Sequence, residues 1–160
     1  MKKGWKRAVL IFLIIAVNIG CDQQTKQMAK EHLEPTEQIS YLNDFFRLTY
    51  VENTGAFLSL GSDFSGGIRY WVLKIFPVVL LLGLLLYTFF SNNLNSWSII
   101  AFSFILGGGI SNIYDRLLYN GVIDFMNMGF PGLRTGIFNF ADVSIMVGLF
   151  MMLPTLFQKK

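Results

Sequence analysis

The chain has 160 residues, 53% of them apolar and only 14% charged, and its net charge of +3 at pH 7 comes from cations near the chain ends rather than from a patch. This length suits one domain. A fraction of charged residues so far below the ~25% of a soluble domain excludes an ordinary soluble fold and predicts a protein embedded in a bilayer. Because the net charge does not form a patch, nucleic acid is not expected among its partners. One cysteine excludes an internal disulfide framework, and one histidine with one cysteine argues against zinc, which needs about three or four ligands, so no cofactor is expected.

The first predicted element is a membrane span over about residues 5–21. Residues 1–7 carry four cations, and the apolar run that follows ends at Cys21. The run is shorter than the ~20 residues of a usual span, and with Gly20 before the cysteine it also resembles a lipoprotein cleavage site. However, Asn18 stands where such sites have a large aliphatic residue, and three more apolar runs follow. A polytopic membrane protein is therefore predicted.

The longest polar segment covers about residues 22–70 and holds seven of the ten acids. A helix is expected to continue through about Leu33. On this helix Asp22 and Lys26 are four residues apart, in the acid-first order that favours pairing. Structural pairing is therefore the preferred interpretation of both side chains.

A half-buried strand is predicted after this helix, because apolar and polar residues alternate over residues 46–51. Asn53-Thr54-Gly55 has the residues of a turn, and residues 56–60 are expected to form a returning strand.

Three further apolar runs predict further spans, over about residues 71–90, 97–113 and 138–157. Pro77 is expected to kink the first of these. In the second, the small residues Ser103, Gly107 and Ser111 lie four apart, a spacing that lets transmembrane helices approach closely.

Four spans place both chain termini on the same side of the membrane. Six lysines and arginines lie at the two ends, and because positively charged loops stay inside, both termini are predicted to be cytoplasmic. Residues 22–70 and an exposed loop over residues 114–137, with a turn at Pro131-Gly132, are then extracytoplasmic. The predicted fold class is a membrane all-α protein: a single polytopic domain with a four-transmembrane-helix bundle and a small extracytoplasmic β-rich cradle.

Asp124 and Asp142 stand in strongly apolar sequence, and neither has a cation within four residues. A carboxylate at the edge of a bilayer is costly unless it is paired or functional. Burial and a second carboxylate raise a carboxyl pKa, so two such groups can share one proton and act as base and acid. Spacing alone leaves a structural alternative open, in which Asp124 ends a strand and Asp142 caps the fourth helix.

Three asparagines accompany these carboxylates, Asn53, Asn112 and Asn139. Amides can orient a carboxylate or a substrate backbone without adding charge, and Asn139 shares a helix face with Asp142 three residues later. Taken alone, the first asparagine would be a turn residue and the second an interhelical contact. Arg116 is expected at the outer interface, holding a lipid phosphate or a carboxylate, and Asp115 is expected to have a helix-end or loop role.

Five motifs occur in a defined order, CDQQTK, NTGAF, GGxxxNIYDR, GVIDF and FNFAD. Together they resemble the bacterial lipoprotein signal peptidases (signal peptidase II), over nearly the whole chain. The resemblance implies an aspartic endopeptidase of the bacterial plasma membrane, with its active site at the outer face. Such an enzyme removes the signal peptide from diacylglyceryl-modified prolipoproteins, just before the lipidated cysteine. Membrane lipids and globomycin-type cyclic peptides, which would sit against the aspartates, are further implied partners.

Carried over by motif, the resemblance implies that the catalytic pair is Asp124 and Asp142, with no metal. The implied supporting and substrate-binding residues are Asp22, Lys26, Asn53, Gly55, Gly108, Asn112, Arg116 and Asn139. The chain departs from the family pattern after Gly55, where many members have a second small residue before the phenylalanine. This departure concerns the local shape of the cradle beside Asn53.

Three other functions are open on the residues alone. A small transporter or proton channel would need acids near mid-bilayer on several spans, whereas these acids cluster at one face. A metal-dependent lipid hydrolase could bind Mg²⁺ through Asp and Asn oxygens and would lose activity in EDTA. A non-catalytic membrane adaptor would tolerate Asp→Asn changes at positions 124 and 142.

Overall fold

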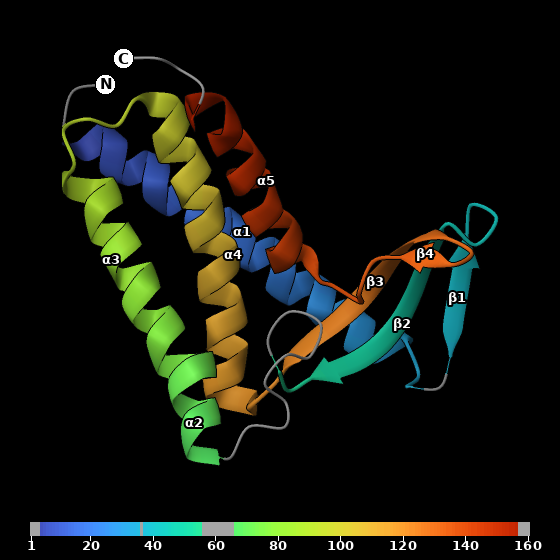
Figure 1. The fold of residues 1–160 in the computed structure, drawn as a ribbon. Helices are drawn as coiled ribbons and strands as arrows, with labels where there is room; N and C mark the ends of the chain where they lie inside the picture. The colour runs from blue at the N-terminus through green and yellow to red at the C-terminus, as the bar shows by residue number, and fades with distance from the viewer. Residues whose placement is uncertain (1–3, 36, 56–65, 157–160) are drawn as a thin grey trace.

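A computed structural model of the chain describes residues 4–35, 37–55 and 66–156. Long helices form a bundle, and a four-stranded antiparallel sheet lies beside one end of it (Figure 1). The helical elements are α1 (Trp5–His32), α2 (Gly66–Tyr70), the π-helical η2 (Trp71–Ile75), α3 (Phe76–Phe90), α4 (Ser96–Tyr119) and α5 (Phe140–Leu156). The strands, in spatial order, are β1 (Gln38–Tyr41), β2 (Phe46–Asn53), β3 (Val122–Phe130) and β4 (Leu133–Arg134).

Several helices of the described chain are suited to a bilayer. Trp5–His32, Gly66–Phe90 and Ser96–Tyr119 are long and apolar enough to cross a membrane, and Phe140–Thr155 is a shorter apolar helix. Large apolar side chains on these helices are exposed, for example Phe12 and Phe150. Exposed apolar surface on this scale indicates contact with lipid rather than water. The architecture is that of a multi-pass membrane protein with a small sheet, in agreement with the coarse prediction.

α4 occupies the centre of the bundle and packs against α1, α3 and α5. Its small residues permit this, as the sequence predicts. A Cβ on Gly107 would lie 2.7 Å from Cβ of Asn18 in α1, and a Cβ on Gly108 would lie 2.2 Å from the carbonyl oxygen of Ala141 in α5. Ser103 in the same helix is completely buried. The backbones of three helices therefore meet where glycine leaves room.

α1 is one continuous helix that contains both the first predicted span and the helical stretch after it. Its 28 residues extend over about 42 Å at ~1.5 Å per residue, which exceeds the ~30 Å of a hydrocarbon core. One face has a buried residue every three or four positions, apolar at Ile11 and Ile15 and polar at Asn18, Asp22 and Lys26. The buried residues of this face are Arg7, Ile11, Ile15, Asn18, Asp22, Lys26 and Ala29.

The kink predicted at Pro77 corresponds to a π-helical stretch immediately before it. The N–H of Phe76 donates to the carbonyl of Trp71, five residues back rather than four. Proline lacks an N–H and its ring clashes with the carbonyl four residues earlier. A wider turn at Trp71–Ile75 accommodates this, and α2, η2 and α3 form one continuous helical stretch.

Four helix ends meet at the end of the bundle that lies away from the sheet. Arg7 near the start of α1 donates from Nη1 to the carbonyl of Ser91 after α3, at 2.9 Å. Trp97 near the start of α4 donates from Nε1 to the carbonyl of Met151 near the end of α5, at 2.6 Å. The beginning of α1 and the end of α5 thus lie on the same side of the molecule (Figure 1).

The prediction that residues 114–137 form an exposed loop is wrong. These residues complete α4 and then form β3 and β4, and β3 pairs with β2 in antiparallel register, with Val51 opposite Asp124. The strand prediction is confirmed for β2, and the turn between β3 and β4 lies at Pro131-Gly132, where Gly132 has φ +85°, a conformation that favours glycine. The returning strand expected over residues 56–60 lies outside the described residues.

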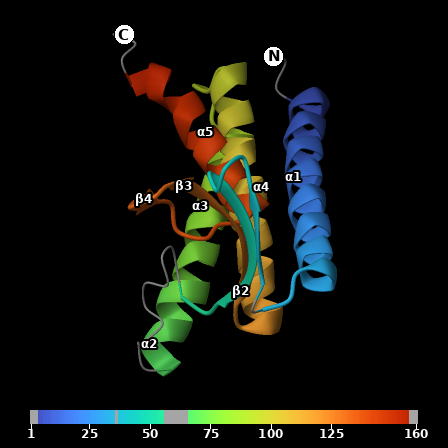
Figure 2. The same ribbon diagram turned by 90° about the vertical axis from the view of Figure 1, so that its right-hand side faces the viewer.

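The sheet is fixed to the bundle at two places. Ala29 and Leu33 at the end of α1 form a small apolar core with Phe125 of β3. Phe138, just before α5, pairs with β3 by exchanging hydrogen bonds with Met126 at 2.8 and 2.9 Å. Figure 2 shows the sheet in front of α4, between α1 and α2. The second attachment holds the beginning of α5 against the strand that carries Asp124.

Candidate active site

Asp124 in β3 and Asp142 in the first turn of α5 are linked by Asn139. Nδ2 of Asn139 donates to Oδ1 of Asp124 at 2.7 Å, and Oδ1 of Asn139 accepts the N–H of Asp142 at 3.0 Å. In return, Oδ2 of Asp142 accepts the N–H of Asn139 at 3.2 Å. This reciprocal pair is a capping box at the N-terminus of α5. Asp142 is therefore a helix cap and, through the same asparagine, a neighbour of Asp124.

Two further asparagines complete the environment of the carboxylates. Nδ2 of Asn53 donates to Oδ2 of Asp124 at 2.8 Å, and Nδ2 of Asn112 donates to Oδ1 of Asp142 at 2.9 Å. Each carboxylate oxygen thus accepts one N–H from an asparagine. Because these donors are neutral, they fix both carboxylates without cancelling their charge. β2, α4 and the start of α5 each supply one of the three amides.

Asp124 is deeply buried, with 4% of its surface exposed. Burial raises the pKa of its carboxyl from 3.8 to about 6, and the nearby Asp142 carboxylate contributes to the rise. The hydrogen bonds from Asn53 and Asn139 act in the opposite direction, because they stabilise the charged form. A carboxyl with a pKa close to neutral can both accept and release a proton under physiological conditions.

A buried ionic cluster of Lys26, Asp22 and Asp115 contacts the side-chain amide of Asn112. Nζ of Lys26 is 2.6 Å from Oδ2 of Asp22 and 2.6 Å from Oδ2 of Asp115, and it donates to Oδ1 of Asn112 at 2.9 Å. These contacts use all three donors of the ammonium group. The predicted pairing of Asp22 with Lys26 is confirmed. The cluster also orients Asn112, whose other end holds Asp142.

Asp22 ties the cluster to the start of α5. Its Oδ1 accepts the N–H of Ala141 at 2.8 Å, and its Oδ2 accepts the hydroxyl of Ser111 at 2.7 Å. Ala141 directly precedes Asp142. A carboxylate on the first N–H groups of a helix is favourable, because these groups carry partial positive charge. α1, α4 and α5 therefore converge next to the candidate catalytic residue.

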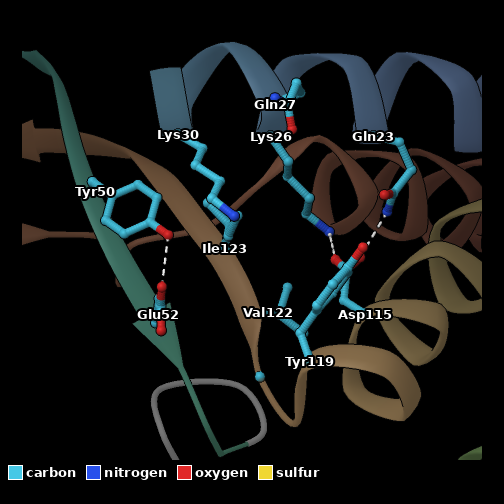
Figure 3. A pocket seen from close by; sticks show the side chains of 11 residues that line it. Gln23, Lys26, Gln27, Lys30, Tyr50, Glu52, Asp115, Tyr119, Val122 and Ile123 are labelled. Atoms are coloured by element: carbon cyan, nitrogen blue, oxygen red, sulfur yellow. Dashed lines mark hydrogen bonds and ion pairs between the residues drawn. The ribbon is translucent and has the colours of Figure 1, made fainter. Parts of the chain in front are cut away.

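Asp115 has a different role from the one expected. It is buried, with 4% of its surface exposed, and it pairs with Lys26 and accepts Nε2 of Gln23 at 2.8 Å. Figure 3 shows Lys26 and Gln23 of α1 pointing to Asp115 across a polar pocket. The expectation of a helix-end or loop role is wrong because α4 continues to Tyr119. The signal in the sequence was its position three residues after Asn112, on the same helix face.

Arg116 lies on the other side of the aspartates. Its Nη2 donates to the carbonyl of Gly55 at 3.1 Å and its Nη1 to the carbonyl of Asn112 at 3.3 Å. Its Nε is buried and has no hydrogen-bond partner among the described residues. Gly55 in turn donates its N–H to Oδ1 of Asn53 at 2.9 Å. The structure thus brings all ten of the predicted site residues into one contiguous region, including Gly108, which contacts Ala141.

A groove of about 580 Å³ runs between α3, α4 and α5 and reaches Asp142. Most of its lining is apolar, with side chains such as Leu80 and Ile145, and its polar residues are Asn112, Arg116 and Asp142. A groove of this kind favours a ligand with a large apolar part and one polar group near the carboxylates. Within the described part of the chain, no group of three or more His, Cys, Asp or Glu residues is arranged to hold a metal ion.

The sequence is similar to a known family over most of its length. The family model described as "Signal peptidase (SPase) II" matches residues 14–158. A lipoprotein signal peptidase of Chlorobium phaeobacteroides (strain BS1) is 41% identical over 150 residues, which cover 87% of this chain and 90% of that protein. A lipoprotein signal peptidase of Microcystis aeruginosa is 32% identical over 157 residues, covering 98% of this chain and 97% of the relative.

The fold is also found among solved structures. A bacterial membrane enzyme solved by the in meso method at 2.3 Å resolution has a TM-score of 0.79 and 25% sequence identity, covering 91% of this chain and 86% of that chain. A second bacterial membrane enzyme, solved at 1.9 Å, has a TM-score of 0.81 at 24% identity and covers 94% of both chains. The helices and the sheet are therefore arranged as in known membrane enzymes.

Proposed function

The chain belongs to the signal peptidase II family and removes signal peptides from prolipoproteins, and we propose that it does so as an aspartic endopeptidase with Asp124 and Asp142 as the catalytic pair. The observation that carries this proposal is the position of Asn139, which hydrogen-bonds to both aspartates, one of which, Asp142, lines an apolar groove.

In the proposed reaction the two carboxyls share one proton. The ionised carboxylate takes a proton from water while the water oxygen attacks the peptide carbonyl, and the protonated carboxyl gives its proton to the carbonyl oxygen. Collapse of this intermediate breaks the C–N bond, and the proton held by the base passes to the leaving nitrogen. One hydroxyl proton of the intermediate returns to the other carboxylate, which restores the shared proton. The products are a signal peptide with a free carboxylate and a lipidated cysteine with a free amine.

The groove accounts for the substrate class. The substrate carries a diacylglyceryl group on the cysteine after the scissile bond, so it needs apolar surface close to the catalytic carboxylates. The groove supplies this surface with α3 on one side, and Asp142 lies within it. Membrane lipids fill the groove when no substrate is bound. A globomycin-type cyclic peptide is expected to bind in the same groove, against the aspartates.

The proposed topology has four transmembrane helices, with α5 as the fourth, in the bacterial plasma membrane. The start of α1, with Lys6 and Arg7, and the end of α5 lie at the end of the bundle away from the sheet. Because cationic flanks stay inside, this end is proposed to be cytoplasmic. The sheet then forms an extracytoplasmic cradle, and the aspartates lie at the outer face, where a lipidated substrate presents its peptide bond.

A gel-shift assay on a lipid-modified prolipoprotein tests the proposal. Wild type should cleave it, and Asp124→Asn and Asp142→Asn should each be inactive while their thermal unfolding in detergent stays close to that of wild type. Asp44→Asn is the matched control, because this carboxylate lies in the turn after β1 and binds Arg47 rather than the amide network. This variant should cleave normally.

Two outcomes would contradict the aspartic mechanism. Full activity of Asp142→Asn would remove the carboxylate pair from the reaction. Loss of wild-type activity in EDTA, with recovery on addition of Mg²⁺, would favour metal-dependent hydrolysis. The transporter and the adaptor are not favoured, since the chain belongs to a peptidase family.

A further inference from the structure

A second pocket, of about 250 Å³, adjoins the groove at the end of α4. Three of its lining residues are cations, and none of the described lining residues carries a carboxylate. The cationic pocket, as we call it here, is lined by Arg69, Lys74 and Arg116 together with Thr54, Tyr70 and Asn120. This composition contrasts with the buried cluster around Lys26, where two carboxylates face one ammonium group.

The cations of this pocket are held in place by neutral groups. Nη2 of Arg69 donates to the carbonyl of Thr54 at 2.6 Å, and Nζ of Lys74 donates to Oδ1 of Asn120 at 2.7 Å. Arg116 donates to two backbone carbonyls, and its buried Nε has no hydrogen-bond partner among the described residues. Its charge also interacts with the carboxylates of Asp142, Asp124 and Asp115. No described carboxylate forms an ion pair with any of the three cations. Carbonyl and amide oxygens orient a cation but leave its net charge in place, so Arg69 and Lys74 make the pocket electrostatically suited to an anion.

The cationic pocket adjoins the apolar groove. Leu73 and Arg116 line both of them. Arg116 also contacts the carbonyl of Asn112, the residue that holds Asp142. A ligand that lies in the groove beside Asp142 is therefore adjacent to the pocket at Arg116. The two spaces differ in chemistry, since one is apolar and the other is cationic.

We infer that the cationic pocket is the subsite for the residues that follow the lipidated cysteine, and that it favours an acidic side chain there. This inference rests on the proposed function. The lipid and the signal peptide need apolar surroundings, whereas the chain after the cysteine must leave towards water. Arg116 lines both the groove that contains Asp142 and the pocket, so the residues directly after the cysteine are those nearest to the pocket. A carboxylate would be attracted to Arg69 and Lys74, and a lysine would be repelled.

The test uses three prolipoprotein substrates that differ only in the residue after the cysteine: aspartate, asparagine or lysine. Wild type should have a kcat/KM about threefold to tenfold higher for the aspartate substrate than for the asparagine substrate, the size of one or two exposed ion pairs. The lysine substrate should be the poorest. Because exposed charges are screened by salt, the preference should shrink as ionic strength rises.

The double variant Arg69→Gln with Lys74→Gln should cleave all three substrates with nearly equal kcat/KM. The readout is a ratio of substrates, so it does not depend on how much of the variant folds. Lys30→Gln is the matched control. Lys30 is an exposed lysine at the other pocket, near Glu52 (Figure 3), and this variant should keep the wild-type ratio.

Failure of the inference is distinguishable from failure of the proposed function. Cleavage of all three substrates by wild type at equal rates would overturn the subsite while leaving the peptidase intact, whereas no cleavage of any would contradict the function itself. An aspartate preference that persists in the double variant would place its origin outside the pocket. A third outcome would assign the pocket to a lipid phosphate instead. In that case the three substrates are cleaved at equal rates, and phosphatidylglycerol stimulates wild type but not the double variant.

Discussion

Replacement of Gly108 by alanine tests whether the close contact between α4 and α5 sets the position of the proposed catalytic pair. A Cβ at Gly108 would lie 2.2 Å from the carbonyl oxygen of Ala141, which is 1.2 Å closer than the 3.4 Å at which ordinary van der Waals contact begins. It would also lie 2.9 Å from Cγ1 of Ile145. The first obstacle is backbone, so α5 itself must shift, at the residue next to Asp142.

The expected effect on catalysis is large because the shift occurs where the site is assembled. A misplacement of about 1 Å can reduce a rate by about 10²-fold, so we expect kcat/KM to fall about 100-fold, equivalent to about 2.7 kcal/mol. The same shift strains the hydrogen bond from Ala141 to Asp22, 2.8 Å long in the native structure. Overpacking of this kind costs about 1–3 kcal/mol of stability, so thermal unfolding in detergent should begin at a lower temperature.

Two glycine controls separate positioning from general packing. Gly148→Ala would place a Cβ 2.5 Å from the carbonyl oxygen of Ala101, so it strains the same helix pair farther from the site and should lower stability with a smaller loss of activity. Gly83→Ala on α3 has nothing within 4 Å and should behave as wild type. The assay measures kcat/KM on one lipid-modified prolipoprotein and the unfolding temperature of each variant.

One pattern of results would refute this reasoning. If Gly108→Ala loses stability to the same extent as Gly148→Ala but keeps activity within about threefold of wild type, a shift of α5 does not reach the aspartates. The contact at Gly108 would then serve packing alone. The carboxylates would have to be positioned by the amides from β2 and α4 without the help of α5.

Two further predictions concern the charges of the site. Because burial raises the pKa of Asp124 from 3.8 to about 6, the folded protein binds a proton in this interval that the unfolded chain has lost. Stability should therefore fall as pH rises through this interval. Denaturation of Asp124→Asn in detergent should show a shallower slope, and an unchanged slope would contradict the shifted pKa. Lys26→Met should cost about 3–5 kcal/mol of stability, because it leaves Asp22 and Asp115 buried without a cation. The control Lys30→Met replaces an exposed lysine and should change stability by no more than about 0.5 kcal/mol. Similar losses in both variants would contradict the buried cluster.

The features that sequence reasoning could predict are those whose cause is local. An apolar run predicts a membrane helix without knowledge of its partners, and the four-residue spacing of Asp22 and Lys26 is sufficient to pair them on one helix. β2 was predictable from alternation within residues 46–51. Glycine at position 132 predicted the turn between β3 and β4 because few other residues adopt its backbone conformation.

The features that were missed depend on contacts between distant residues. β3 pairs with a strand about 70 positions earlier, for example Val122 with Asn53, and the apolar residues around Asp124 do not reveal that pairing. Asp115 meets Lys26 across 89 positions of sequence. Its neighbour in the sequence, Arg116, points to a different side of the helix and contacts Gly55. A sequence without an alignment gives no signal for such pairs, so only the family resemblance indicated that these segments meet.

The geometry of Asp142 is compatible with both interpretations of this residue, the helix cap and the catalytic group. In the capping box, Oδ1 and the backbone N–H of Asn139 bind Asp142 at the start of α5, and the side-chain Nδ2 of Asn139 donates to Asp124. Asp142 caps the start of a helix, whereas Asp124 lies in a strand and is almost fully buried. Two carboxyls in such different environments can take different protonation states, which is the condition for one to act as an acid while the other acts as a base. The capping hydrogen bonds that begin α5 therefore also position Asp142 for the proposed reaction.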